Sequence, residues 1–65
     1  MRALEEVVLA KDEMEAVRLC DLEGLDMVKA SAKMKISKST VHRLLAVAHR
    51  KIADGLINGK ALLIG

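Results

Sequence analysis

The sequence contains no phenylalanine, tyrosine, tryptophan or proline, and it has a single cysteine. Although 52% of the residues are hydrophobic, any core must be built from leucine, isoleucine, valine, methionine and alanine. One cysteine excludes an internal disulfide. A chain of 65 residues forms one domain at most, and so small a domain buries only about 60% of its unfolded surface. We therefore expect one domain over residues 1–65, and a homodimer is a possible source of further burial.

Long apolar runs are absent as well, because no stretch reaches the roughly 18 residues of a membrane-spanning helix. The first residues, MRALEEVVLAKDE, carry acids where a signal peptide has its apolar segment. A single cysteine also fits a reducing compartment. These absences together predict a soluble cytoplasmic protein.

The net charge is only +2, but the charges are divided unevenly along the chain. Residues 1–26 carry three bases and eight acids, whereas residues 27–65 carry eight bases and one acid. The net charge of the first part is therefore −5 and that of the second part is +7. This asymmetry indicates that the second part faces a polyanion. The alternative is that both parts are simply solvated and pair with one another.

Apolar spacing and capping residues predict three helices. Gly24 is placed to be a left-handed C-terminal cap. Asp26 and Ser37 are placed to be N-caps of the two segments that follow. The helices are expected over residues 11–23, 27–34 and 37–58.

The two ends of the chain are expected to be extended. EEVVLA favours a short strand around residues 7–9, and KALLIG favours a short strand or an extended tail. Gly55 lies inside the third predicted helix and costs about 1 kcal/mol relative to alanine, which weakens the last turn. The predicted fold class is therefore all-α, with three helices and short extended or strand-like ends.

A short helix with small residues, a tight turn and a longer helix together predict a helix-turn-helix. Ala30 and Ser31 are the small residues, and Ile36 is the apolar residue of the turn. In this motif the first turns of the second helix meet base edges in the major groove. Ser37 as a cap leaves the positive end of that helix free to face phosphate.

Two groups of side chains are candidates for contact with DNA. The candidate base-facing residues are Lys38, Ser39, His42 and Arg43. Arginine pairs bidentately with guanine, and hydroxyl groups serve several bases. The candidate phosphate-contacting residues are Lys33, Lys35, Ser37, Arg50 and Lys51. The alternative for Lys38, His42 and Arg43 is an ordinary solvated helix face.

Residues suited to other chemistry are not arranged for it. His42 and His49 lie seven residues apart, about 10 Å along a helix, which is too far for both to bind one metal. Cys20 falls on the apolar arc of the first helix and is interpreted as a core residue. The sequence shows no phosphate-binding loop and no nucleophile–base pair. We expect no enzyme activity, no metal, no cofactor and no small-molecule site.

Two segments, DEMEAVRLCDLEGL and KMKISKSTVHRLLAVAHRKIADGLINGKALLI, resemble a prokaryotic family of small uncharacterised proteins. The resemblance extends from about Glu5 to Ile64 and includes the Ser-x-x-Thr pattern and the GKAL ending. That family is predicted to bind DNA through a helix-turn-helix similar to region four of sigma factors. The resemblance therefore implies a sigma-region-four-like fold and transcription regulation, with Lys38, Ser39, His42 and Arg43 at groove-facing positions.

The chain departs from the family pattern near the candidate interface. The family usually has glycine at the position of Lys35 and an acid at the position of Lys29, so both departures add positive charge. Family members also tend to carry a basic, proline-containing segment upstream of the point where this chain begins. Because glycine is usual at its position, Lys35 is predicted to adopt a positive φ.

Two hypotheses about function follow from the sequence. The first is sequence-specific binding of double-stranded DNA, with the helix that starts at Ser37 inserted in the major groove. The second is a protein-interaction or dimerisation module on the same fold, which docks to the transcription machinery or to a like chain. A homodimer would use one or both apolar ends, or the outer face of the long helix, because a two-stranded pairing alone is marginal in water.

Overall fold

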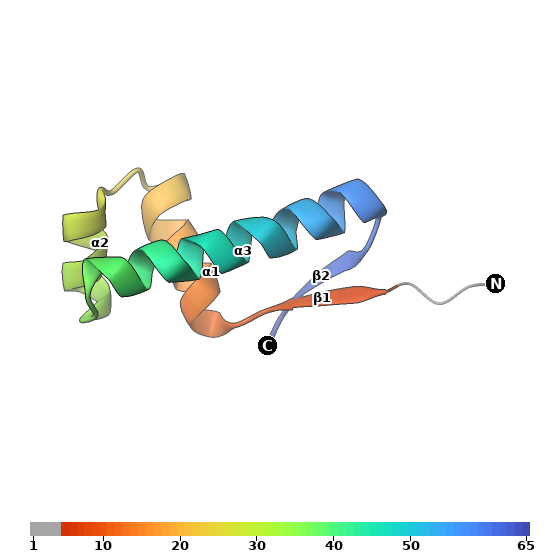
Figure 1. The fold of residues 1–65 in the computed structure, drawn as a ribbon, viewed down its shortest axis with the longest axis horizontal. Helices are drawn as coiled ribbons and strands as arrows, with labels where there is room; N and C mark the ends of the chain where they lie inside the picture. The colour runs from red at the N-terminus through yellow and green to blue at the C-terminus, as the bar shows by residue number, and fades with distance from the viewer. Residues whose placement is uncertain (1–4) are drawn as a thin grey trace.

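Helical segments and a small sheet form an elongated molecule, with principal extents of 46 × 18 × 17 Å (Figure 1). The computed structural model describes residues 5–65, so the first four residues of the expected domain lie outside the described range. The elements are β1 (Glu6–Leu9), α1 (Lys11–Val17), η1 (Arg18–Leu22), α2 (Met27–Met34), α3 (Lys38–Asn58) and β2 (Ala61–Ile64). Three predicted helical regions and both predicted strands are thereby confirmed. In the described part, no helix is both long enough and apolar enough to cross a membrane.

The first helical region changes its hydrogen-bonding pattern before it ends. It is α-helical as far as Val17 and continues as the π-helical turn η1, in which the Glu23 N–H bonds to the Arg18 carbonyl at 3.0 Å. The helix predicted over residues 11–23 is therefore present, but its last part is π-helical rather than α-helical. Gly24 has a φ of 75°, which confirms it as the left-handed cap. Apolar spacing over so few residues does not distinguish a π turn from an α turn.

The next helix and the turn after it follow their capping residues. The Asp26 carboxylate accepts the Lys29 N–H at 2.8 Å and starts α2. Lys35 ends α2 with φ 59° and ψ 42°, so the predicted positive φ at this residue is confirmed. The Ile36 N–H then bonds back to the Ser31 carbonyl at 3.1 Å. This closed turn returns the chain tightly enough for α3 to pack against α2.

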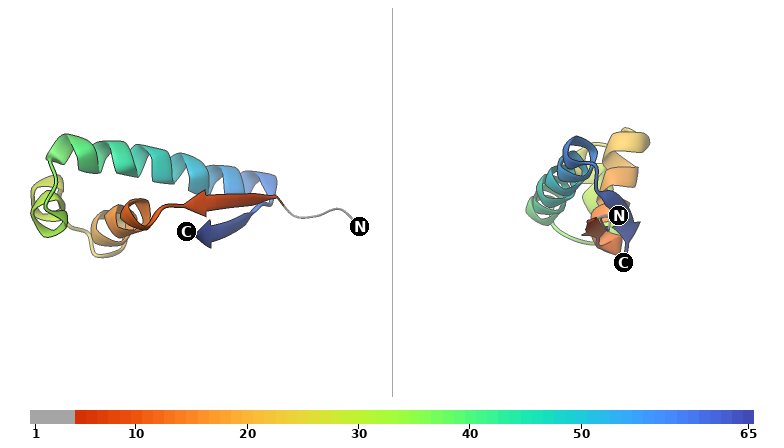
Figure 2. Two further views of the ribbon diagram at one scale, coloured as in Figure 1. Left: turned by 90° about the horizontal axis from the view of Figure 1, so that it is seen from below. Right: turned by 90° about the vertical axis from the view of Figure 1, so that its right-hand side faces the viewer.

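The long helix α3 runs most of the length of the molecule (Figure 2). The Ser37 hydroxyl accepts the Thr40 N–H at 3.1 Å, so the predicted N-cap is confirmed. The helix ends at Gly59, whose φ is 66°. Gly55 does not interrupt the helix, and a Cβ at this position would collide with the Leu62 side chain. The missing side chain at Gly55 therefore lets β2 approach α3 closely.

The two strands pair in parallel, with Glu6 opposite Ala61 and Leu9 opposite Ile64. Parallel pairing needs a crossover connection, and here all the helices lie between the two strands in sequence. Val7 and Leu9 are buried, while the residues between and before them are exposed, as expected for a strand covered on one face. Over residues 5–65 the sheet has only these two strands, so each strand is an edge strand.

A small aliphatic core lies between α3 and the other helices. Its main cluster consists of Ala16, Leu19, Ala30, Val41 and Leu45. Leu56 continues the three- and four-residue spacing of Val41, Leu45, Ala48 and Ile52 along α3, but it is 73% exposed. Figure 1 shows why: α3 extends past α1, and only the sheet accompanies its last turns.

Candidate nucleic-acid interface

The N-terminal turn of α3 carries a cluster of hydroxyl groups. The Ser37 Oγ atom lies 2.8 Å from Thr40 Oγ1 and 3.1 Å from Ser39 Oγ. These bonds hold three hydroxyl groups together at the positive end of the helix. Because a hydroxyl group both donates and accepts hydrogen bonds, the cluster offers both kinds of partner to an incoming ligand.

The residues predicted to face bases gather on one exposed surface of α3. Lys38, Ser39, His42 and Arg43 are all exposed. At 100° per residue they lie within an arc of about 140°. Ser39 and Arg43 begin a stripe that continues through Ala46 to Arg50, at spacings of four, three and four residues. The geometry brings the candidates together, while their contact with bases stays a prediction.

Four of the five residues predicted to contact phosphate are also exposed. Lys33, Lys35 and Ser37 lie around the turn between α2 and α3, and Arg50 lies further along α3. Lys51 is different, because its side chain is directed to β1 and α1. Its ammonium group donates to the Val8 carbonyl at 2.9 Å and to Glu13 Oε1 at 2.7 Å.

The Lys51–Glu13 pair joins three elements. Glu13 is only 9% exposed, and its carboxylate also accepts the Ala10 N–H at 2.9 Å. The hydrogen bond from Lys51, followed by that from Ala10, holds the pKa of Glu13 below its usual range. The pair therefore ties the start of α1 and the β1 backbone to α3. This geometry gives Lys51 a structural role and does not favour the predicted phosphate contact.

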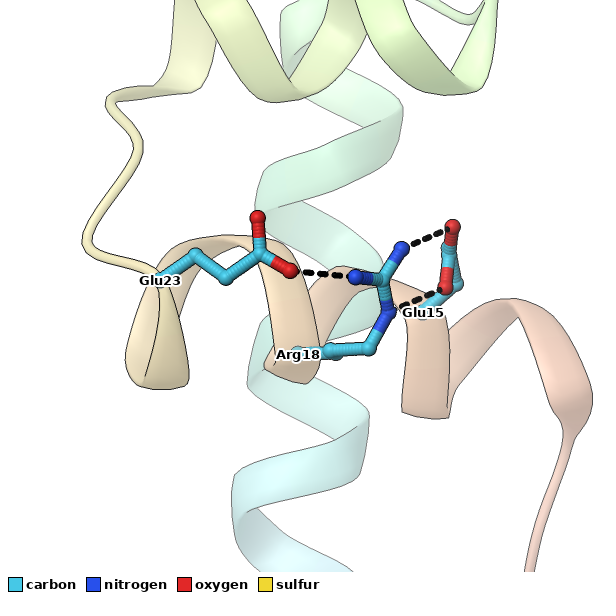
Figure 3. A network of polar contacts seen from close by, with 3 residues as sticks. All are labelled: Glu15, Arg18 and Glu23. Atoms are coloured by element: carbon cyan, nitrogen blue, oxygen red, sulfur yellow. Dashed lines mark hydrogen bonds and ion pairs between the residues drawn. The ribbon is translucent and has the colours of Figure 1, made fainter.

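Two acids of the first part of the chain, Glu15 and Glu23, are paired with a base of the same part. Arg18 donates to both carboxylate oxygens of Glu15, at 2.8 and 2.9 Å, and it also pairs with Glu23 across η1 (Figure 3). The hydrogen bond from Arg18 lowers the pKa of Glu15. Ion pairs between the two oppositely charged parts, within the described residues, are Glu13–Lys51, Asp21–His49 and Glu5–Lys60. The acidic part therefore neutralises little of the basic part.

One continuous basic segment remains over α2, the turn and most of α3. Residues 27–53 contain seven lysines and arginines and no acid. Lys51 has the internal partner described above. The other six bases form no ion pair with any described residue; they are Lys29, Lys33, Lys35, Lys38, Arg43 and Arg50, and we call them the basic set. Their summed field attracts a polyanion.

Sequence reasoning missed or undervalued two positions of this surface. Lys29 is exposed near the start of α2, although it was not among the residues predicted to contact DNA. Ala46 is exposed between Arg43 and Arg50, where its small side chain permits close approach of another molecule. The spacing of four, three and four residues from Ser39 to Arg50 indicates in the sequence that Ala46 lies on the same helix face as Arg43 and Arg50.

The remaining reactive side chains lie elsewhere. Cys20 is half-buried beside the core, and burial, followed by the nearby Asp21 and Asp26 carboxylates, raises the pKa of its thiol. A raised pKa disfavours the reactive thiolate, so Cys20 behaves as a small core residue. Among residues 5–65, no three His, Cys, Asp or Glu side chains are grouped so that they could hold a metal ion.

These features define a small helical domain whose ends join in a parallel sheet and whose α2–α3 segment is strongly cationic. The chain belongs to the family described as "Protein of unknown function DUF134", which matches residues 2–65. Membership of a family of uncharacterised prokaryotic proteins, which the sequence resemblance indicated, is thereby confirmed.

Several relatives named UPF0251 protein are similar to the chain. The relative from Prosthecochloris aestuarii is 51% identical over 61 residues, which cover 94% of this chain and 39% of the relative. The relative from Pelotomaculum thermopropionicum is 52% identical over 64 residues, which cover 98% of this chain and 48% of the relative. The chain thus spans less than half the length of these two relatives. No solved structure matches it.

Proposed function

We propose that α2, the turn at Lys35 and α3 form a helix-turn-helix that binds double-stranded DNA sequence-specifically and regulates transcription. The observation that carries the proposal is the segment of residues 27–53, which contains no acid and includes the six bases of the basic set. The short α2, the closed turn and the longer α3 have the order of this motif. By sequence resemblance, the motif is similar to region four of sigma factors.

The proposed mechanism places the first turns of α3 in the major groove, which is wide enough for a helix. Arg43 is the candidate reader of guanine, with Lys38, Ser39 and His42 beside it. The lysines around the turn and Arg50 neutralise phosphates, which positions the protein without reading sequence. The hydroxyl cluster around Ser37 lies at the positive helix end, which suits a phosphate oxygen.

The test is a salt titration of duplex binding, after a preferred site has been selected from random-sequence DNA. The logarithm of the affinity should fall with the logarithm of salt by about 0.9 per neutralised phosphate. Arg43→Ala should cost about 1–3 kcal/mol on the preferred site and relax the preference at one position. Arg50→Ala should weaken all duplexes about equally and reduce the salt slope by about one.

Lys11→Ala is the matched control. Lys11 is exposed on α1, has no ion pair with another described residue and lies outside the basic set. This variant loses the same charge as Arg50→Ala, so it should bind duplexes as the wild type does. Circular dichroism must show the same helix content in all variants. Absence of duplex binding by the wild type at low salt would refute the proposal.

A second candidate function is a docking module for the transcription machinery. Exposed apolar side chains favour it, because Leu22, Leu56 and Ile57 are 80%, 73% and 82% exposed. This function predicts that Ile57→Lys abolishes association with RNA polymerase, whereas Arg43→Ala leaves that association unchanged. The reverse pattern would exclude this second candidate.

A further inference from the structure

The strand β2 leaves one edge of the sheet without a described partner. Its sequence, ALLI, has no charge and no proline, and Leu62, Leu63 and Ile64 are 41%, 40% and 63% exposed. Proteins usually protect such an edge with a charge, a proline, a bulge or a covering segment. Within residues 5–65, β2 has neither a charge nor a proline and pairs only with β1. An edge of this kind is a template for another strand.

The hydrogen bonds to β1 identify which groups of β2 are free. The N–H groups of Ala61 and Gly65 donate to the carbonyls of Glu5 and Leu9, both at 2.9 Å. The direction of the backbone groups alternates along a strand. Residues 61, 63 and 65 therefore direct their N–H and C=O groups to β1, and Leu62 and Ile64 direct theirs outward.

These outward groups match a second β2 strand in the antiparallel direction. If Leu63 lies opposite the same residue of another copy, Leu62 lies opposite Ile64 on both sides of that point. Each Leu62–Ile64 pair then exchanges two hydrogen bonds, which makes four in all. The two Leu63 residues form a non-hydrogen-bonded pair with Cα atoms about 4.5 Å apart. The arrangement is two-fold symmetric, so each copy uses the same surface.

The absence of charge on the edge permits a second copy as the occupant, and the exposed area sets how strong the contact can be. Residues 61–64 carry no charge, and the basic set lies between residues 29 and 50, so two copies meet here without repulsion between charges on the edge. A leucine or isoleucine loses roughly 60–120 Å² of apolar surface on full burial, so one β2 offers on the order of 100–150 Å². A standard interface buries about 800 Å² per partner. The area therefore fits a weak dimer rather than an obligate one.

We propose that β2 pairs antiparallel with β2 of a second copy of this chain and forms a four-stranded sheet in the order β1-β2-β2-β1. The two-fold axis is perpendicular to the sheet, so both α3 helices lie on the same face of it. Gly55 contacts β2, and Ser39 and Arg50 lie about 140–160° around α3 from Gly55. The stripes that contain Ser39 and Arg50 therefore face away from the sheet in the same general direction.

One consequence rests on the proposed function. The two α3 helices run in opposite directions, and each is about 31 Å long, so their N-terminal ends can reach half-sites one or two DNA turns apart. A copy bound at one half-site raises the effective concentration of the next copy. The weak dimer is therefore expected to form cooperatively on a two-fold symmetric site.

Disulfide trapping tests the interface directly, in a Cys20→Ala background. Leu63→Cys places thiols at the two-fold axis, where the Cα separation suits a disulfide. Val8→Cys is the matched control, because Val8 is paired with Leu63 in the register and is 49% exposed. In the proposed dimer the two Val8 residues are three strand spacings, about 14 Å, apart. Mild oxidation should trap Leu63→Cys dimers at least about tenfold faster than Val8→Cys dimers, and equal rates would overturn the proposal.

Sedimentation of the chain without disulfide trapping gives an independent test of the proposed dimer. The wild-type chain should exceed the monomer mass as its concentration approaches about 1 mM, as expected for a weak complex. Leu63→Lys should be monomeric, and so should Leu63→Glu, while their mixture should regain the dimer. A monomeric wild type at that concentration, or a mixture that stays monomeric, would contradict the pairing of β2 with itself.

Duplexes with one and two half-sites separate the dimer from DNA binding. Leu63→Lys should retain affinity for one half-site and lose cooperativity on two. Dimers without duplex binding would uphold this interface and refute the proposed function. Cooperative binding that persists in Leu63→Lys would refute the interface and leave the proposed function standing.

Discussion

The two ends of α3 expose surfaces of opposite character. The part of α3 up to Arg50, together with α2 and the turn, exposes the basic set, and none of these six side chains pairs with a described acid. From Lys51 onward the bases are paired, because Lys51 pairs with Glu13 and Lys60 pairs with Asp54 at 2.9 Å. There the side chains of Leu56, Ile57 and β2 remain exposed. One helix thus joins a surface of bases without acid partners to a surface of exposed apolar side chains and a free strand edge.

This difference indicates two kinds of partner. Unpaired bases in a segment without acids gain most from a polyanion, because counterions are released when phosphate binds. An uncharged strand edge gains most from another strand, because its N–H and C=O groups then find partners. Between the two ends lies one shared core.

The largest expected effect comes from that shared core. Leu19 is 2% exposed and lies in the main cluster between the helices, so Leu19→Ala should lower the free energy of unfolding by about 2–5 kcal/mol. Leu22, in the same π turn, is 80% exposed and provides the control, for which the change should stay within about 0.5 kcal/mol. Urea unfolding followed by circular dichroism measures both. Similar losses in the two variants would show that η1 is not packed as described.

A smaller effect is expected from the pair that fastens the sheet end to α3. Glu13→Gln replaces a charge-assisted hydrogen bond from Lys51 with a neutral one, so stability should fall by about 1–2 kcal/mol near pH 7. The pKa of Glu13 is lowered in the folded state, so its contribution is present above the unfolded pKa and is lost as pH falls through the folded pKa. Wild type and Glu13→Gln should therefore converge in acid. Glu15→Gln is the control, because Glu15 and Arg18 are 45% and 47% exposed and such pairs contribute little.

Local signals in the sequence were sufficient for most of the fold. Asp26 and Ser37 have short side chains that accept N–H groups at helix starts, and Gly24 has no Cβ to oppose a positive φ. The parallel pairing of β1 with β2 was not predicted, because it depends on how the intervening helices return the chain. The sequence marked Gly55 as a weak point of α3, but its role as the contact for Leu62 required both elements in place.

The candidate site was predicted less completely than the fold. Composition and the position of the predicted turn were enough to select Lys38, Ser39, His42 and Arg43, because exposure on one helix face follows from spacing. Lys51 follows Arg50 directly and has similar charge, so the sequence alone did not separate them. A rotation of 100° between neighbours directs Lys51 to Glu13 and leaves Arg50 exposed. The partner of a long side chain depends on the neighbouring elements and not on its own helix.

The smallest expected effect concerns the turn that joins α2 to the basic end of α3. Lys35 holds a φ of 59°, which costs a residue with a Cβ about 1 kcal/mol and costs glycine almost nothing. Glycine also loses more backbone entropy on folding, so Lys35→Gly should raise the free energy of unfolding by between zero and about 1 kcal/mol. Lys33→Gly, within α2, is the control with the opposite sign, because glycine there costs about 1 kcal/mol of helix stability. Thermal melts without DNA measure both variants, and a clear loss of stability in Lys35→Gly would mean that the Lys35 side chain stabilises the turn. If Lys35 also contacts phosphate, Lys35→Gly should weaken duplex binding, although the free energy of unfolding stays the same or rises. Such a result would separate the effect of the Lys35 backbone conformation from that of its charge.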